Sequence, residues 1–107
     1  MLESKIRCAE MGRRWVAEFT RTHARFGESA VNPQYAYDSN HETCLCYFHL
    51  MHYAISDADV VTDVLADKDI LIWKSNLRGV DVRATPPKKI ETREEFDNHL
   101  FSLGFQP

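Results

Sequence analysis

The 107-residue sequence lacks several features that define large functional classes. Its four glycines form no phosphate-binding loop or nucleophile elbow, and it has no His-Glu-x-x-His zinc motif. No segment approaches the ~20 apolar residues that span a bilayer, and an acid, Glu3, stands where a secretory signal has its basic region. We therefore expect a cytoplasmic protein with no membrane partner.

Cysteine is also scarce, and basic residues are not in excess over acidic ones. The three cysteines, Cys8, Cys44 and Cys46, cannot build a disulfide framework, which favours a reducing compartment. The net charge of −3 lacks the basic excess of a protein that coats nucleic acid, so no direct nucleic-acid binding is expected. A chain of this length supports one modest core, and we expect a single domain over residues 1–107.

Hydrophobic periodicity predicts an α+β fold. Residues 2–26 have the apolar spacing of one amphipathic helix, which Gly27 ends. A capping box of Thr92 and Glu95 predicts a short C-terminal helix that closes at Gly104. After a turn at Asn32-Pro33, the segments 34–37 and 42–53 flank a polar loop at 38–41, which predicts an antiparallel hairpin.

Residues 57–75 allow two interpretations. Val60, Val61, Val64 and Leu65 have helical spacing, and Ser56 with Asp59 could cap such a helix. The β-branched content and the turn-like segment 66–69 favour a hairpin instead. Residues 75–79 read as a turn and 80–83 as one more edge strand, which Pro86-Pro87 ends. We therefore expect an antiparallel sheet of four to five strands, with the N-terminal helix on one face and the C-terminal helix at an edge.

Four short segments follow the N-terminal helix in a characteristic order: Tyr35-Ala36-Tyr37-Asp38, Thr43-Cys44-Leu45, Asp63-Val64-Leu65-Ala66-Asp67-Lys68 and Glu91-Thr92-Arg93-Glu94-Glu95-Phe96-Asp97. This order resembles that of small bacterial and phage α+β proteins with an N-terminal helix, an antiparallel meander and a C-terminal helix. The resemblance covers most of the chain, implies the fold and supports the second hairpin. It implies no activity and no functional residue, and the chain departs from it at Cys46, His49 and His52.

The spacing Cys44-x-Cys46-x2-His49-x2-His52 places four possible zinc ligands within nine residues. On a strand, His49 points to the face opposite the other three, and His52 lies roughly 20 Å from Cys46, so a tetrahedral site does not close. We predict packing cysteines and half-exposed histidines, with no metal. A bulge or a helical backbone would reopen the zinc alternative. Cys44 and Cys46 have apolar neighbours on the predicted strand, and Cys8 lies two turns into the predicted helix, so nothing in the sequence activates a thiol. We therefore expect no enzyme and no cofactor.

Charge is unevenly distributed along the chain. Residues 1–26 carry six basic and three acidic side chains (+3), residues 27–69 carry one basic and eight acidic ones (−7), and the remainder carries six basic and five acidic ones (+1). Five aspartates lie within thirteen residues of the acidic middle but lack the Gly and Glu of a calcium loop. We expect them to cluster at one end and edge of the sheet, either to protect that edge or to bind a basic partner: Asp57, Asp59, Asp63, Asp67 and Asp69.

The N-terminal helix carries a secondary, basic stripe. Arg7, Arg14, Arg21 and Arg25 follow at steps of seven and four residues, so they share one face of the helix. This stripe is either a solvated face or a contact for an acidic protein or a phosphate backbone.

Small size, the lack of catalytic motifs and the acidic middle together predict a non-enzymatic protein that binds another protein. We expect an inhibitor or immunity-type protein that blocks the basic, nucleic-acid-binding surface of a larger enzyme or defence complex, as anti-CRISPR and toxin-neutralising proteins do. The alternatives are a zinc-binding regulatory module and a small self-associating structural protein. Both a monomer and a homodimer remain open.

Overall fold

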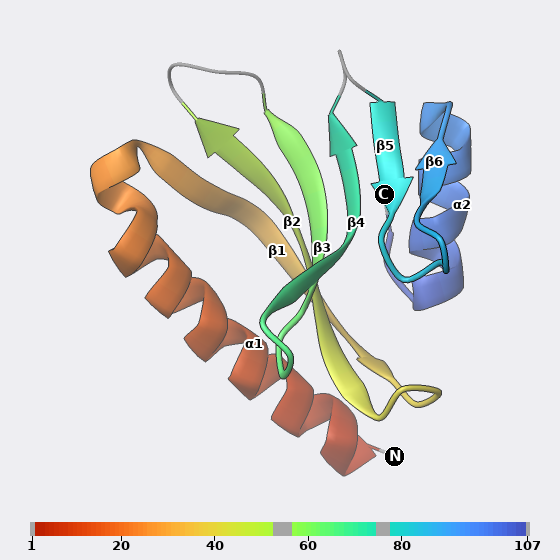
Figure 1. Ribbon diagram of the computed structural model, residues 1–107. Coiled ribbons are helices and arrows are strands. Elements are labelled where there is room, and N and C mark those ends of the chain that lie inside the picture. Colours follow the sequence, from red (N-terminus) through yellow and green to blue (C-terminus); the bar gives the residue numbers. More distant parts are fainter. Residues whose placement is uncertain (1, 53–56, 75–77, 107) are drawn as a thin grey trace.

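The computed structural model describes residues 2–52, 57–74 and 78–106 and has the predicted α+β fold (Figure 1). Helix α1 (Leu2–His23) continues into a short 3-10 helix, η1 (Ala24–Phe26). The strands of the described residues follow as β1 (Glu28–Asp38), β2 (Thr43–His52), β3 (Ala58–Asp63), β4 (Lys68–Lys74), β5 (Arg78–Asp81) and β6 (Lys88–Ile90), and α2 (Arg93–Leu103) closes the chain. They form one antiparallel meander in the order β1-β2-β3-β4-β5-β6, one strand more than the upper expectation.

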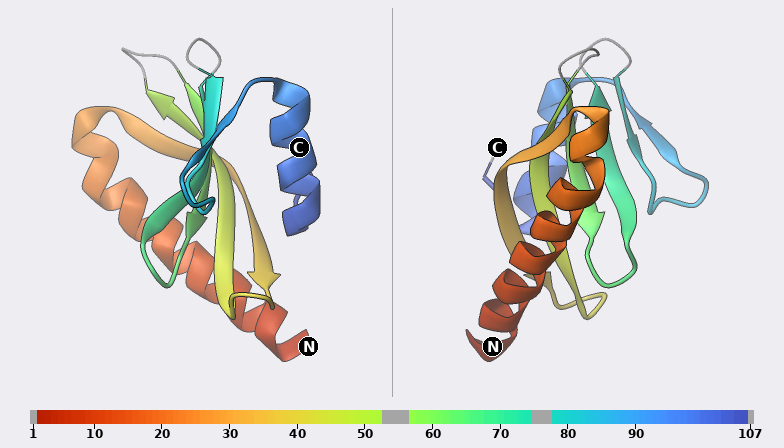
Figure 2. Two further views of the ribbon diagram at one scale, coloured as in Figure 1. Left: turned by 45° about the vertical axis from the view of Figure 1, so that its right-hand side comes forward. Right: turned by 90° about the vertical axis from the view of Figure 1, so that its left-hand side faces the viewer.

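The two helices lie on opposite faces of the sheet (Figures 1 and 2). Helix α1 packs on β1 and β2, as expected. Helix α2 covers the other face rather than an edge, because its buried Phe96 and Leu100 pack in one core with Leu45, Val61 and Ile90. Neither helix, within the described residues, is long and apolar enough to cross a membrane.

The helix boundaries follow the predicted signals. Gly27 adopts a left-handed conformation (φ 73°) and donates its N–H to the carbonyl of Ala24, which ends the N-terminal helical segment. At the other end of the chain, the hydroxyl of Thr92 accepts the N–H of Glu95 at 3.2 Å, and Gly104 (φ 96°) ends α2. Both predicted helices are therefore confirmed.

Strand β1 begins earlier than predicted. The chain at Asn32-Pro33 forms a bulge within β1 instead of a turn before it, with Asn32 at φ 53° and a register shift between Val31 and Gln34. Proline cannot donate to a sheet ladder, but β1 is an edge strand, so a bulge there accommodates it.

The second predicted hairpin is confirmed as β3 and β4. The structure corrects the strands after it, because β5 is an interior strand and pairs with β6, which the sequence did not suggest after Pro86-Pro87. The predicted cap at Ser56 and most of the predicted 75–79 turn lie outside the described residues. The last two residues of that turn, Arg78 and Gly79, belong to β5.

Candidate protein-binding site

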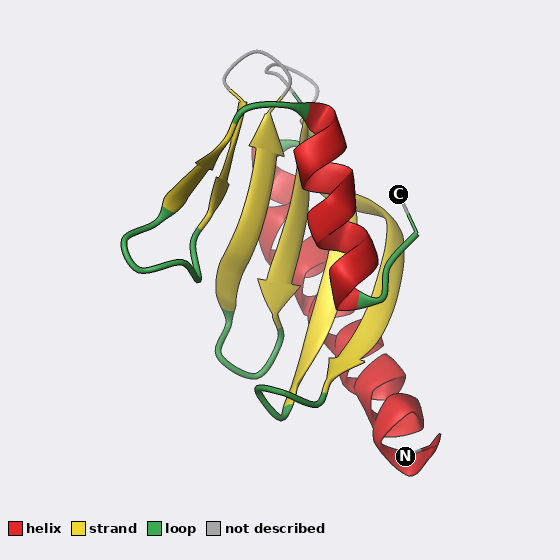
Figure 3. Ribbon diagram, turned by 90° about the vertical axis from the view of Figure 1, so that its right-hand side faces the viewer, coloured by secondary structure: helices red, strands yellow, loops and turns green. Residues whose placement is uncertain are grey.

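Three strands that run in the same direction each end in an aspartate: β1 in Asp38, β3 in Asp63 and β5 in Asp81. Alternate strands of an antiparallel meander are parallel, so these residues lie at one end of the sheet, together with the loops that follow them (Figure 3). Asp63 pairs in register with Leu45 and Asp81 with Leu71, which places both on the face beneath α2. We call the three aspartates the aspartate row, and the three loops (residues 39–42, 64–67 and 82–87) the loop end.

Each aspartate of the row holds the loop that follows it. In the first two turns the Oδ1 atom accepts the backbone N–H groups two and three residues further on, at 3.1 and 3.4 Å after Asp38 and at 3.1 Å twice after Asp63. Both turns end in a left-handed residue, Glu42 (φ 49°) and Asp67 (φ 54°). Asp81 accepts the N–H two residues further on at 3.1 Å. Side-chain hydrogen bonds of this kind replace missing backbone partners and fix the turn.

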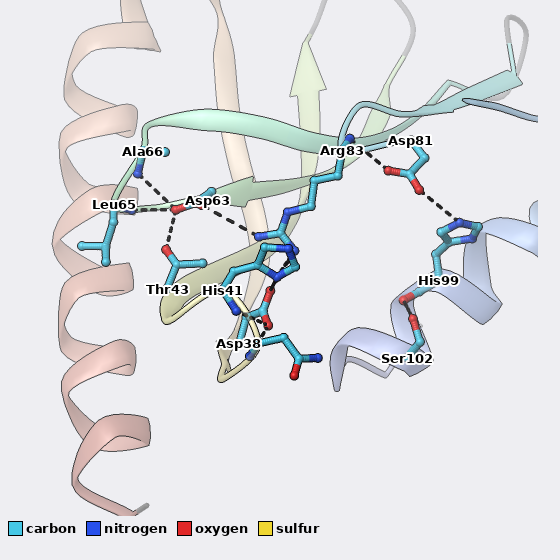
Figure 4. Close-up of polar contacts among 11 residues, drawn as sticks. Asp38, His41, Thr43, Asp63, Leu65, Ala66, Asp81, Arg83, His99 and Ser102 are labelled. Atoms are coloured by element: carbon cyan, nitrogen blue, oxygen red, sulfur yellow. Dashed lines mark hydrogen bonds and ion pairs between the residues drawn. The ribbon is translucent and has the colours of Figure 1, made fainter. Parts of the chain in front are cut away.

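Arg83 reaches back from the loop after β5 and joins two aspartates of the row (Figure 4). Its Nη1 donates to Oδ2 of Asp38 at 2.7 Å, and its Nη2 lies 3.8 Å from Oδ2 of Asp63. Asp63 also accepts the hydroxyl of Thr43 at 2.6 Å. Burial alone raises the pKa of Asp38, but the hydrogen bond and charge of Arg83 outweigh it and hold that pKa below its ordinary value. One guanidinium therefore links the ends of β1, β3 and the loop after β5.

Exposed apolar and acidic side chains lie next to one another at the loop end. Leu65, in the turn between β3 and β4, is 59% exposed, and Val82, at the start of the β5–β6 loop, is 42% exposed. Asp67 and Asp69 follow Leu65 in the chain and are exposed. The indole N–H of Trp15 donates to Asp67 at 3.0 Å, so α1 supports the turn from one side.

The structure divides the five aspartates of the predicted acidic patch between the two ends of β3. Asp57 and Asp59 lie at the end opposite Asp63, four strand residues or roughly 13 Å away. Because β3 is an interior strand, the expected single cluster along a sheet edge is wrong. Three members, Asp63, Asp67 and Asp69, do lie at the loop end. There they meet acidic residues that the sequence reasoning missed: Asp38, Glu42 and Asp81.

The other end of β3 has a cluster of its own, centred on His49. Its Nδ1 lies 3.0 Å from Asp59 and its Nε2 lies 3.1 Å from Asp57. Arg93 of α2 pairs with Asp59 and donates to Asp97 at 2.9 Å. Burial lowers the pKa of His49, but hydrogen bonds and charge from the two carboxylates outweigh it, so the net pKa lies above its ordinary value. We call these five residues the His49 cluster.

Cys46 and His49, two possible zinc ligands in the sequence, lie on opposite faces of the sheet. The three free cysteines are buried, and Cys46 packs in the core beneath α1, whereas His49 faces the α2 side. Burial raises the pKa values of Cys8 and Cys46 to about 12, which disfavours thiolate chemistry near neutral pH. Across residues 2–52, 57–74 and 78–106, no group of three His, Cys, Asp or Glu side chains is placed to hold a metal ion.

The basic stripe of α1 faces solvent along its whole length. Arg7 pairs with Glu3 at 2.6 Å, and Arg21 pairs with Glu18 one turn earlier. The guanidinium of Arg25 lies over the ring of Phe26, 4.8 Å from its centre. Arg14 is exposed as well. Acidic and aromatic neighbours thus engage three of the four arginines.

Asp81 at the end of β5 and His99 and Ser102 of α2 are the residue types of a hydrolytic triad and line one cavity (Figure 4). The Ser102 hydroxyl, however, donates to the backbone carbonyl of His99 at 2.8 Å, not to its ring. A triad serine must donate to the imidazole that takes its proton. Among the residues that the structure describes, this serine therefore donates to no base.

No protein-family model, curated protein or solved structure matches this chain.

Proposed function

We propose that the protein is a non-enzymatic binding protein that uses its loop end to occupy a basic surface of a larger protein. The observation that carries the proposal is the turn between β3 and β4. Leu65 projects there with 59% of its surface exposed, while Asp63 and Trp15 hold the turn around it. A turn that is already ordered loses little conformational entropy on binding, and an apolar anchor within a polar rim is typical of interfaces.

The charge of the loop end supports a basic partner. Residues 38–42, 63–69 and 81–87 carry six acidic and two basic side chains. A surface of one sign accelerates association with a surface of the opposite sign and rejects like-charged competitors. Nucleic-acid enzymes expose such basic surfaces. We therefore propose that the protein inhibits a nucleic-acid enzyme or defence complex by covering that surface, in the manner of anti-CRISPR and toxin-neutralising proteins.

The chemistry of the reactive side chains supports binding over catalysis. The raised pKa values of Cys8 and Cys46 keep their thiols protonated near neutral pH, and the Ser102 hydroxyl donates to a backbone carbonyl. The carboxylates of the aspartate row hold loops and Arg83, so their role in the fold is already evident.

The test changes the exposed residues and leaves the aspartate row intact. In the test variant, Leu65→Ser is combined with Asp69→Lys. The matched control combines Phe101→Ser with Glu94→Lys on α2, which also removes one exposed apolar side chain and reverses one exposed carboxylate. Each purified protein is used for capture from bacterial lysate, followed by measurement of the dissociation constant with the purified captured partner.

We expect the test variant to bind that partner at least about tenfold more weakly than the wild type, and the control to bind unchanged. Raising the salt to about 1 M, where charges are screened within ~3 Å, should also release the wild-type complex. Equal binding by the test variant and the wild type would refute the proposal. A complex that survives high salt would refute its electrostatic part.

A further inference from the structure

A small cavity adjoins the loop end between β4, β5 and α2. Its volume is about 190 Å³, and Ile70, Leu71 and Leu103 form its apolar wall. Its polar lining consists of Asp81, Arg83, His99 and Ser102. The cavity is thus apolar along one side, and its polar part includes a carboxylate and an imidazole.

Nε2 of His99 faces Oδ2 of Asp81 across the cavity. His99 Nδ1 lies 2.8 Å from the carbonyl oxygen of Glu95, which can only accept, so Nδ1 carries the proton. In the neutral imidazole, Nε2 is then an acceptor, and it lies 3.6 Å from Oδ2 of Asp81, which is also an acceptor. This distance exceeds that of a hydrogen bond. Both atoms therefore keep acceptor capacity for an N–H group from outside.

We propose that this cavity receives a cationic side chain, lysine or arginine, of the partner protein. An ammonium or guanidinium group carries several N–H donors and can bond to both acceptors, while its methylene stem covers the apolar wall. The inference rests on the proposed function, because the cavity shares Arg83 with the loop end and would take a side chain from the same basic surface.

Two basic residues lie near Asp81, and neither neutralises its Oδ2 atom. Arg83, which lines the cavity, has its guanidinium engaged with Asp38 and Asp63. Lys88 is the register partner of Asp81 on β6, but within the described residues the two form no ion pair. Asp81 uses Oδ1 to hold the loop and leaves Oδ2 for the guest.

The experiment titrates the isotopically labelled full chain with blocked single amino acids and follows its backbone amide signals by NMR. The probes are N-acetyl-lysine methylamide and N-acetyl-arginine methylamide, with N-acetyl-norleucine methylamide as the uncharged control. We expect saturable shifts at Asp81, Arg83 and His99 with the two cations and a dissociation constant on the order of millimolar. The norleucine probe should bind about tenfold more weakly or not at all, because it offers no donors to the two acceptors.

The variant Asp81→Asn keeps the oxygen that holds the loop but removes the charge. We expect it to weaken the binding of both cations about tenfold, whereas Asp57→Asn, which alters a histidine-paired carboxylate at the far end of β3, should have no effect. Equal binding of norleucine and lysine, shifts that do not saturate, or an unchanged Asp81→Asn variant would each overturn the inference.

These outcomes separate the inference from the proposed function. If the cavity binds no cation but the Leu65→Ser, Asp69→Lys variant loses the partner, the cavity assignment fails and the loop-end proposal stands. If the cavity binds the cations but the same variant keeps the partner, the loop-end proposal fails alone.

Discussion

Each end of β3 combines aspartates with one arginine and one histidine, and the two histidines have different places. At the loop end Arg83 joins Asp38 and Asp63, and His41 pairs with Asp38. At the opposite end His49 lies between Asp57 and Asp59, and Arg93 joins Asp59 to Asp97 of α2. Arginine keeps its charge at every physiological pH, whereas histidine changes charge between about pH 5 and 8. At the loop end a permanent charge therefore joins Asp38 and Asp63, whereas the charge between Asp57 and Asp59 changes with pH.

The ends also differ in what they leave exposed. At the loop end the aspartate row holds the loops, and Leu65 is exposed beside it. Asp67 and Asp69 are exposed as well, although each accepts one side-chain hydrogen bond, from Trp15 and Thr62. In the His49 cluster, Arg93 binds the cluster to α2, so its carboxylates serve the attachment of that helix. The carboxylates at the loop end thus support an exposed surface, whereas those of the His49 cluster attach α2 to the sheet.

The largest expected effect comes from removing the central aspartate of the loop end. Asp63 accepts hydrogen bonds from Thr43 and from two backbone N–H groups, and it pairs with Arg83. We expect Asp63→Ala to lower the free energy of unfolding by about 2 to 4 kcal/mol, because three donors and one cation lose their partner at once.

Chemical denaturation measures this loss, and Asp69→Ala, which removes only one bond to Thr62, provides the control with a loss of about 1 kcal/mol or less. A loss below about 1 kcal/mol for Asp63→Ala would show that the aspartate row does not hold the loop end.

Local signals in the sequence predict much of the fold but little of the aspartate row. The caps at Gly27, Thr92 and Gly104, and the two hairpins, depend on residues close in sequence, and each is confirmed. Strand β6 has only three residues and pairs with β5 across a proline-containing loop, so no local pattern marks it.

The site depends on pairing between distant segments. Asp57 and Asp63 are near in sequence but lie at opposite ends of a strand, whereas Asp38 and Asp63 are far apart in sequence and share Arg83. An aspartate that ends every second strand is a signal visible in the sequence. It predicts a cluster only once the strand boundaries and the meander order are known, and β5 ends at Asp81 rather than at the expected Arg83.

Asp38→Asn should remove part of the acid sensitivity of the loop end. The lowered pKa of Asp38 means that its stabilising effect is present above the pKa of the unfolded chain and is lost as the pH falls through the folded value. Asparagine keeps the oxygen that holds the turn but carries no charge for Arg83. We expect a loss of about 1 to 2 kcal/mol at neutral pH that shrinks on acidification, measured by denaturation between about pH 2 and 7. A loss of equal size across that range would contradict the role of the charge.

The smallest loss of folding stability is expected for a substitution of His49. Its dependence on pH has the opposite sign to that of Asp38→Asn. The pKa of His49 is raised, so its stabilising effect is fully present below the pKa of the unfolded chain and is lost as the pH rises through the folded value. His49→Gln should therefore cost a few tenths to about 1 kcal/mol in mild acid, the side chain being 36% exposed, and less as the pH rises towards about 9. Denaturation of the wild type and His49→Gln across this range measures the difference in stability. Asp38→Asn is the reference, because its effect on stability varies only at acid pH. If the difference between wild type and His49→Gln did not depend on pH, His49 would act by packing alone. The contrast between a permanent cation at the loop end and a titrating one at the opposite end would then disappear.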